Sequence, residues 1–228
     1  MEIFAGSKRL TAAMMKNGYK VDTVEIMDGG AHNDMSLQAT VMDIVSRVKS
    51  KKYKYIHMAP PCSTFSNARH PKLRSKAEPD GKSDLSQSNR NIVKYHNALL
   101  NNTFKLANTC AENGVALSLE NPNSSIMWHT RVFKVFEQTW NPRMIIMDYC
   151  SYGEKYKKRT KLMVWAPGDK KSFLDPLNKL CDGKHKHQHL SGWRNMDKNV
   201  NEIMVPTKGT PPYPLKLCTE WAELIKHL

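Results

Sequence analysis

The sequence has no long hydrophobic run, and no stretch approaches the ~18 apolar residues that a membrane-spanning helix needs. Its first residues, Met1-Glu2-Ile3-Phe4, lack the basic and apolar regions of a signal peptide. The five cysteines are an odd number, are widely spread and include no Cys-x-x-Cys pair, which argues against a disulfide-rich secreted domain. We therefore expect an intracellular protein, cytoplasmic or nuclear and not bound to a membrane, in a reducing compartment that permits a reactive thiol.

Acidic residues are scarce relative to basic ones. Asp and Glu total 21 against 35 Lys and Arg, which gives a formal net charge of +14. An excess of this size indicates a polyanionic partner, most commonly nucleic acid, although a basic solvated surface without a partner is the alternative. The 228 residues with 40% hydrophobic content suffice for one buried core, and we expect a monomer.

Short apolar runs alternate along the chain with segments of helical period. The runs predict strands at residues 3–5, 19–26, 53–58, 115–119, 144–147 and 162–165. The helical periods fall near residues 10–14, 37–48, 92–113, 128–136 and 217–228. This alternation predicts an α/β fold, in which a parallel sheet is covered by helices on both faces.

The compact pattern is interrupted twice. Residues 63–90 are polar and show little periodicity, so we predict a long loop, which inside a compact domain is usually functional or disordered. After Pro167 the sequence becomes irregular, basic and histidine-rich. The expected organisation is a core at 1–167, a small basic segment at 168–212 and a C-terminal helix at 213–228 that packs back on the core.

Candidate sites fall at the carboxyl ends of predicted strands, where open α/β sheets bind their ligands. Phe4-Ala5-Gly6-Ser7 is a strand-to-helix turn whose glycine allows a ligand to approach the backbone closely, or it is an ordinary turn. In Pro60-Pro61-Cys62-Ser63, two prolines stiffen the exit from a strand and hold a nucleophilic cysteine at its tip. The alternative for that cysteine is a buried small hydrophobe.

Two further segments carry ionisable groups. Glu120-Asn121-Pro122 follows a buried-type strand, where desolvation would raise the pKa of the carboxyl group and suit it to proton donation. A capping or loop glutamate is the alternative. The basic run Tyr156-Lys157-Lys158-Arg159-Thr160-Lys161 enters a strand, and its alternative is a solvated charged edge.

The order and spacing of these segments resemble the cytosine-5 DNA methyltransferases. Phe4-Ala5-Gly6 is similar to that family's cofactor loop, and Pro61-Cys62 is similar to its nucleophile motif. Glu120-Asn121 resembles its Glu-Asn-Val motif, and Tyr152-Gly153 with the basic run resembles its Gln-x-Arg-x-Arg segment. The resemblance implies a Rossmann-like sheet typical of methyltransferases that use S-adenosylmethionine.

The resemblance covers residues 1–165. It is closest to a compact branch that carries Pro-Pro-Cys-x-Thr-Phe-Ser and Glu-Asn-Pro-x-Ser-Ser-x-x-Trp, and both motifs are present here, at 60–66 and 120–128. Between the basic run and the C-terminal helix, family members carry a target-recognition region. Only residues 168–212 are left for it in this sequence, so the resemblance implies a very small one.

The resemblance also implies a chemistry, the methylation of carbon 5 of cytosine in DNA. Cys62 would add to carbon 6 of the ring, and Glu120 would interact with ring nitrogen 3. Lys158 and Arg159 would steady the base or the adjacent phosphates. Because the target carbon is inaccessible in a duplex, the base would have to be flipped out.

Contacts to S-adenosylmethionine and DNA follow from the same resemblance. Glu25 would hold the ribose hydroxyls and Asp34 would approach the adenine amine, unless they are ordinary surface acids. The other expected cofactor contacts are Phe4, Ala5, Gly6, Ser7 and Pro60. The expected nucleic-acid contacts are Ser63, Arg69 and Arg74, with Lys72 and Lys76 on the same loop, and Lys184 and Lys186; a solvated loop is the alternative.

The sequence departs from the family in several places. The first turn reads Gly6-Ser7-Lys8 where the family has Gly-x-Gly, and a lysine there could obstruct the cofactor. The basic run has Lys158 at the first arginine and Thr160 at the second. The C-terminal Gly-Asn-x-Val-Pro motif is not visible, and Pro212-Tyr213-Pro214 is a distant echo of it.

One histidine-rich cluster comprises Cys181, His185, His187 and His189. Its spacing matches none of the standard zinc-finger patterns. We therefore expect no metal ion, and a phosphate-contacting loop in which these histidines alternate with Lys184 and Lys186.

Three alternatives to a DNA enzyme remain. Cytosine-5 methyltransferases that act on tRNA share the Pro-Cys and Glu-Asn pairs. An inactive nucleic-acid binder that kept the fold would be consistent with Lys8. A cysteine hydrolase would need a histidine partner for Cys62, and His57 lies on the adjoining predicted strand.

Overall fold

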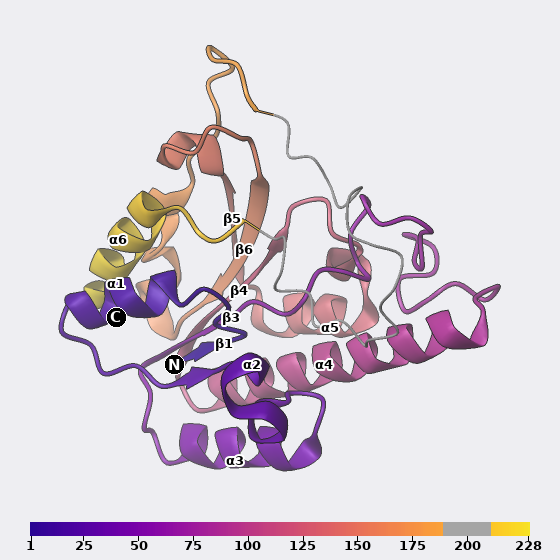
Figure 1. Ribbon diagram of the computed structural model, residues 1–228. Coiled ribbons are helices and arrows are strands. Elements are labelled where there is room, and N and C mark those ends of the chain that lie inside the picture. Colours follow the sequence, from indigo (N-terminus) through magenta and orange to yellow (C-terminus); the bar gives the residue numbers. More distant parts are fainter. Residues whose placement is uncertain (189–210) are drawn as a thin grey trace.

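The computed structural model describes residues 1–188 and 211–228. A six-stranded sheet lies at its centre, in the order β2-β1-β3-β4-β6-β5 (Figure 1). The strands are β1 (Glu2–Ile3), β2 (Thr23–Val24), β3 (Tyr55–Met58), β4 (Ala116–Pro122), β5 (Arg143–Asp148) and β6 (Arg159–Trp165). The predicted α/β fold is confirmed.

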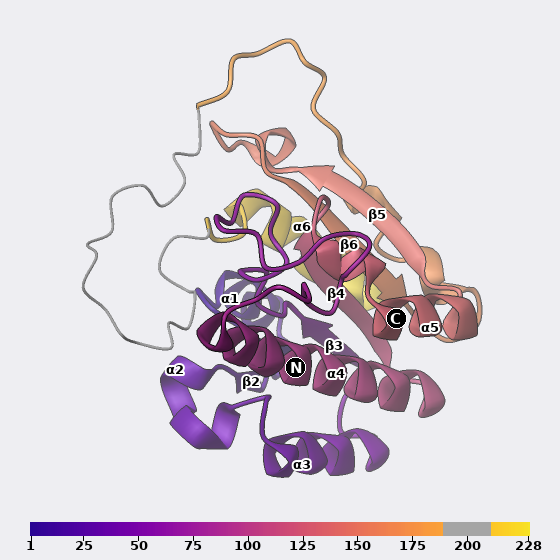
Figure 2. The same ribbon diagram turned by 90° about the vertical axis from the view of Figure 1, so that its right-hand side faces the viewer.

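Helices cover both faces of this sheet. The α-helices are α1 (Arg9–Lys16), α2 (Ile26–Gly29), α3 (Gln38–Lys49), α4 (Gln87–Glu112), α5 (Arg131–Trp140) and α6 (Leu215–Leu224). The 3₁₀ helices are η1 (Gly30–Asn33), η2 (Ile126–His129), η3 (Tyr149–Tyr152), η4 (Gly168–Ser172), η5 (Asp175–Leu177) and η6 (Ile225–His227). Helices α1 and α6 lie on one face, and α4 and α5 lie on the other (Figures 1 and 2).

The sheet is mixed, which corrects the prediction of a parallel one. Strands β2, β1, β3 and β4 are parallel neighbours, whereas β6 runs antiparallel to both β4 and β5. The reason is the connection from β5 to β6, which consists only of residues 149–158. A parallel crossover needs about a dozen residues or more and usually a helix, so this short link forces reversal.

Alternation along the inner strands builds two cores. Leu117 and Met163 pack with the apolar faces of α3, α4 and α5. Leu162 and Val164 point the other way and pack with α1 and α6. Because successive strand side chains point to opposite faces, a strand buried on both sides is mostly apolar, and in β4 Ala116, Leu117 and Leu119 are apolar while the buried Ser118 is hydrogen-bonded.

Local hydrogen bonds explain two element boundaries that differ from the predictions. The strand expected at 19–26 is short because the Glu25 carboxylate accepts from the Met27 N–H and caps α2. The helix expected from residue 92 begins five residues earlier, at Gln87, because Ser86 accepts a hydrogen bond from the Asn89 N–H.

The segment after β6 begins as part of the second core. Phe173, Leu174 and Leu177 are buried there with Trp221 of α6, and α6 packs against α1. These three residues of the segment expected at 168–212 therefore pack with the core, and residues 189–210 of that segment lie outside the described part of the chain. Within residues 1–188 and 211–228, no helix combines the length and apolarity needed to cross a membrane.

A substitution at Leu117, which lies in the central strand β4, tests this packing. Its side chain has no exposed surface, so Leu117→Ala should lower the free energy of unfolding by about 2–5 kcal/mol. Leu180 is 53% exposed, and Leu180→Ala should change that free energy by less than about 0.5 kcal/mol. Urea unfolding of both variants provides the measurement, and equal losses would contradict the described packing.

Candidate active site

The candidate site is built on the carboxyl ends of β3 and β4. These strands are parallel neighbours, so the segments that leave them emerge at the same edge of the sheet. Asn121 Nδ2 donates a 2.9 Å hydrogen bond to the Pro60 carbonyl oxygen, and this contact is buried. This bond holds the Pro-Pro-Cys segment against the Glu-Asn-Pro segment at the edge of the sheet where both strands end.

Cys62 lies just beyond this bond, at the start of a tight turn. The Phe65 N–H donates to the Cys62 carbonyl at 2.9 Å, and Phe65 itself is buried and bound to the Ile126 N–H. The thiol is half-buried. Burial raises the pKa of Cys62, the negative charge of Glu120 raises it further, and Lys158 acts to lower it.

Glu120 is buried, with 7% of its surface exposed. Burial raises the pKa of its carboxyl group, against the opposing effects of Lys158 and of a hydrogen bond from Tyr213. The Tyr213 hydroxyl donates to Oε2 at 3.4 Å, and Lys158 Nζ lies 4.0 Å from Oε1. Oε1 is buried and has no hydrogen-bond partner among the described residues, so its hydrogen-bonding capacity is unused.

A chain of hydrogen bonds supports Glu120 from below. The Tyr213 hydroxyl lies 3.0 Å from His57 Nε2, and His57 Nδ1 lies 2.8 Å from the Ser118 hydroxyl. Ser118 bonds to the Tyr55 hydroxyl, which accepts from Trp221 Nε1 at 2.9 Å.

Burial lowers the pKa of His57 to about 3, so this imidazole is neutral at physiological pH. Both its nitrogens are occupied, which removes it as the histidine partner that a cysteine hydrolase would need.

The basic run contributes one side chain to the site rather than two. Lys158 reaches Glu120 and also lies 4.8 Å above the ring of Tyr149. Arg159 points away and forms a two-pronged ion pair with Asp148, through Nε at 2.9 Å and Nη2 at 2.7 Å. Successive residues of an extended strand face opposite sides, so the structure brings Lys158 but not Arg159 to Glu120.

The cofactor residues predicted from the first two strands also meet. The Gly6 N–H donates to Glu25 Oε2 at 2.8 Å, which joins the loop after β1 to the end of β2. Phe4 and Gly6 adopt positive φ angles of 60° and 49°, so this loop turns sharply. Ala5 is buried, whereas Gly6 and Ser7 are exposed at the edge of the sheet.

The remaining predicted cofactor residues lie around this loop. Asp34 accepts hydrogen bonds on Oδ1 from the Ser36 N–H at 2.8 Å and the Tyr95 hydroxyl at 3.4 Å. Lys8, which the sequence left as a potential obstruction, forms a 2.5 Å ion pair with Asp28. That pair gives the lysine a defined position beside α2.

The structure corrects the prediction that Arg74 contacts nucleic acid. It is 3% exposed, and its guanidinium donates to Thr64, Asn97 and the carbonyls of Pro79 and Val93. These bonds hold the 63–86 loop against α4, so Arg74 is not available to a phosphate.

The other predicted contacts of the loop differ from Arg74. Arg69 is half-buried, and its Nε is buried without a hydrogen-bond partner among the described residues. The Ser63 hydroxyl lies 3.3 Å from His96 Nε2. Lys72, Lys76, Lys184 and Lys186 are exposed.

Comparisons with known proteins add little to this picture. The sequence matches no protein-family model and no curated protein. Among solved structures, a mutant of DNMT2 from Spodoptera frugiperda aligns with 74% of this chain at 14% identity and a TM-score of 0.39. The match covers 50% of that protein, so this chain spans about half its length. So distant a likeness carries no argument about function, which must come from the site's own residues.

The burial of Arg74 generates one prediction. Arg74→Gln leaves buried acceptors unpaired, so it should lower the free energy of unfolding by about 1–3 kcal/mol and expose the 63–86 loop to protease. Lys72→Gln, at an exposed position of the same loop, should change stability by less than about 0.5 kcal/mol. Urea unfolding and limited proteolysis measure both effects, and a stable, protected Arg74→Gln protein would refute the buried role.

The electrostatic coupling of the thiol generates another. Alkylation of Cys62 by iodoacetamide should show an apparent pKa above the ordinary cysteine value of about 8.5. Glu120→Gln removes a negative charge and should lower that pKa, whereas Lys158→Met removes a positive charge and should raise it. Rates measured against pH by mass spectrometry provide the test, with the exposed Lys155→Met as control. A downward shift in Lys158→Met would contradict the geometry.

Proposed function

We propose that the protein is an S-adenosylmethionine-dependent methyltransferase that acts on carbon 5 of cytosine in DNA. The observation that supports this most directly is that the segments carrying Cys62 and Glu120 leave parallel neighbouring strands at one edge of the sheet, with Lys158 beside Glu120. A nucleophile beside a desolvated acid is the minimum that this reaction requires, because carbon 5 of cytosine does not attack an electrophile unaided.

Cys62 acts as the nucleophile in this proposal. Its thiolate sulfur forms a bond to carbon 6 of the ring, and the electrons of the 5,6 double bond shift toward carbon 5. Bound S-adenosylmethionine would supply an electrophilic methyl group to carbon 5, and its sulfonium–methyl bond would break with S-adenosylhomocysteine as the leaving group. A base then removes the carbon 5 proton, the carbon–sulfur bond breaks, and the thiolate leaves with the double bond restored.

Glu120 supplies the acid. Because burial raises the pKa of its carboxyl group, the protonated form persists closer to neutral pH than in an exposed glutamate. That form can donate to ring nitrogen 3 from Oε1, the oxygen that lacks a partner among the described residues. A neutral Glu120 also no longer opposes ionisation of Cys62, so base binding and thiol activation support each other.

The residues around the first two strands fit a bound nucleoside cofactor. Glu25 accepts one hydrogen bond on each oxygen, and a carboxylate offers about four acceptor positions, so it retains capacity for two ribose hydroxyls. Asp34 would approach the adenine amine, and Phe4 and Gly6 would lie against the bound cofactor. Pro60 is bonded to Asn121 through its carbonyl and would close the side toward Cys62.

The DNA partner is proposed from charge and exposure. The net charge of +14 favours a polyanion, and Arg69, Lys72, Lys76, Lys184 and Lys186 are the basic residues we assign to phosphates. The target base would be flipped out of the duplex at a cost of a few kcal/mol. Residues 63–86, which Arg74 holds in place, would lie over the flipped nucleotide.

A covalent trap tests this function. Duplex DNA containing 5-fluorocytosine should form a stable methylated adduct with the protein in the presence of S-adenosylmethionine, because fluorine cannot leave as a proton does. Cys62→Ser should abolish the adduct, and Glu120→Gln should slow its formation by about 10²–10⁴-fold. Intact-mass spectrometry detects it.

Cys110→Ala, a change at a buried cysteine of α4 outside the site, serves as the matched control and should keep the adduct. An adduct only with fluorinated RNA would transfer the proposal to an RNA substrate. No adduct with either polymer, in a folded protein that binds nucleic acid, would favour an inactive binder and overturn the proposal.

A further inference from the structure

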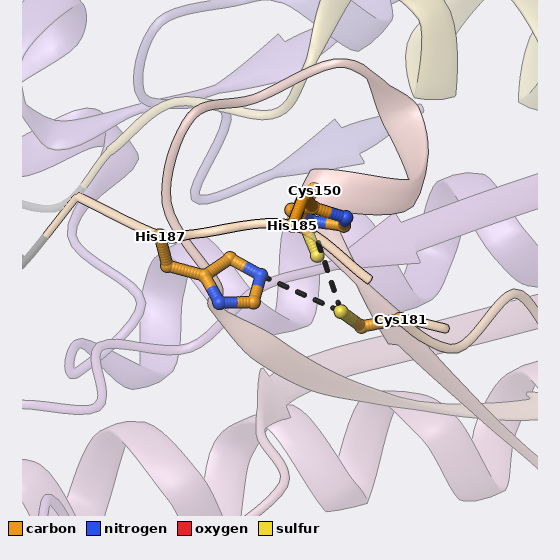
Figure 3. A group of neighbouring side chains, drawn as sticks. All are labelled: Cys150, Cys181, His185 and His187. Atoms are coloured by element: carbon orange, nitrogen blue, oxygen red, sulfur yellow. Dashed lines mark hydrogen bonds between the residues drawn. The ribbon is translucent and has the colours of Figure 1, made fainter. Parts of the chain in front are cut away.

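A second group of reactive side chains lies apart from Cys62. Cys150 belongs to η3, directly after β5, whereas Cys181, His185 and His187 belong to the segment that follows η5 (Figure 3). One potential ligand atom from each residue lies within 4.8 Å of those of the other three. Two sulfurs and two imidazole nitrogens therefore converge from two separate parts of the chain.

The distances fit a single small ion. Cys181 Sγ lies 3.4 Å from His187 Nε2 and 3.7 Å from His185 Nε2, and Figure 3 shows these contacts as dashed lines. A tetrahedral zinc ion with bonds of about 2.3 Å to sulfur and 2.0–2.1 Å to nitrogen separates such atoms by about 3.5 Å. The observed separations lie on either side of that value.

Hydrogen bonds donated by backbone N–H groups hold the two segments together. The Cys181 N–H donates to Asp148 Oδ2 at 2.9 Å, and the Asp148 N–H donates to the Lys179 carbonyl at 2.9 Å. Further along, the Gln188 N–H donates to the Lys155 carbonyl at 2.8 Å. These hydrogen bonds involve none of the four ligand atoms, yet they bring those atoms together.

Hydrogen bonds to neighbouring groups orient His185 and Cys181 so that their ligand atoms face the cluster. His185 Nδ1 lies 3.3 Å from the Asp182 carboxylate, which leaves Nε2 to face the cluster. Metal-binding histidines usually donate their other nitrogen to a carboxylate in this way. The Gly183 N–H lies 3.3 Å from Cys181 Sγ and would stabilise the thiolate form that binds metal.

The donor set selects among metals. Thiolate and imidazole ligands favour zinc, whereas magnesium and calcium prefer oxygen ligands, and no carboxylate oxygen belongs to the group of four. Four protein ligands close a tetrahedral shell and leave no position for a substrate, which is typical of a structural site. Two thiolates also neutralise the charge of a divalent ion.

We propose that Cys150, Cys181, His185 and His187 bind one structural zinc ion, which fastens segment 181–188 to the end of β5. Binding deprotonates both thiols and releases those protons to solvent. Lys184 and Lys186 alternate with the histidine ligands, so the ion would fix both exposed lysines relative to the sheet. This site is independent of the methyl-transfer proposal.

The proposal replaces the expectation of no metal ion. That expectation rested on spacing within residues 181–189, where only one cysteine is present. The second cysteine comes from η3 and could not be paired with the cluster before β5 and β6 were placed. His189, the remaining histidine of the predicted cluster, lies outside the described residues.

Metal analysis of the untagged full chain tests the site. Protein purified without chelators should contain one zinc per chain by inductively coupled plasma mass spectrometry. Cys181→Ser and His187→Ala should lose most of it. Cys62→Ser and His32→Ala, which change the same residue types outside the cluster, should retain it. A natural chain that carries only a small fraction of one zinc would overturn the proposal, as would full retention in both ligand variants.

Cobalt gives a readout that reports the ligands themselves. Reconstitution with Co²⁺ should produce the visible absorption of a tetrahedral site and a thiolate-to-cobalt charge-transfer band. Cys150→Ser should weaken that band, because one of two thiolates is lost. If the variants do not fold, the natural chain alone tests the zinc site. Removing the metal with a chelator should expose two additional thiols to a disulfide reagent. Unchanged thiol reactivity would contradict the proposal.

Discussion

The parallel pairing of β3 with β4 is the constraint on which the rest of the site depends. It delivers Cys62 and Glu120 to one edge of the sheet, and the buried bond from Asn121 to the Pro60 carbonyl prevents their segments from separating. A one-residue slip in this pairing would turn each side chain to the opposite face. The register is protected because β4 is buried on both sides, so that either face would be disrupted by a slip.

Burial of a carboxyl group at that edge has a free-energy cost, which its surroundings offset in part. Lys158 approaches one oxygen of Glu120 and Tyr213 donates to the other. Behind Tyr213 the hydrogen bonds continue through His57 to the core that contains Trp221. Glu120 therefore has a cation beside one oxygen and a chain of neutral hydrogen-bonding groups behind the other.

The sequence predicted the alternating elements and placed Cys62 and Glu120 at strand ends, because both features depend on local periodicity. It did not predict how β6 runs, since strand direction depends on the length of a connection whose ends were uncertain. The opposite orientations of Lys158 and Arg159, and the buried role of Arg74, follow from strand placement and loop packing. Tyr213 carried only the weak signal of an aromatic residue between two prolines before the last helix. Its contact with Glu120 joins residues too distant in sequence for any pattern to connect.

That contact has a consequence for the order in which the protein is made. Tyr213 follows Glu120 by 93 positions, and a ribosome adding 5–20 residues per second needs roughly 5–20 s to reach it. During this interval the nascent chain already contains the cysteine and the acid, together with the strands that align them. The acid lacks the hydroxyl that fixes its orientation, and His57 lacks one of its two partners. Cys62 and Glu120 are therefore translated well before Tyr213, and the candidate site reaches its final geometry only when the segment that carries Tyr213 packs against the sheet.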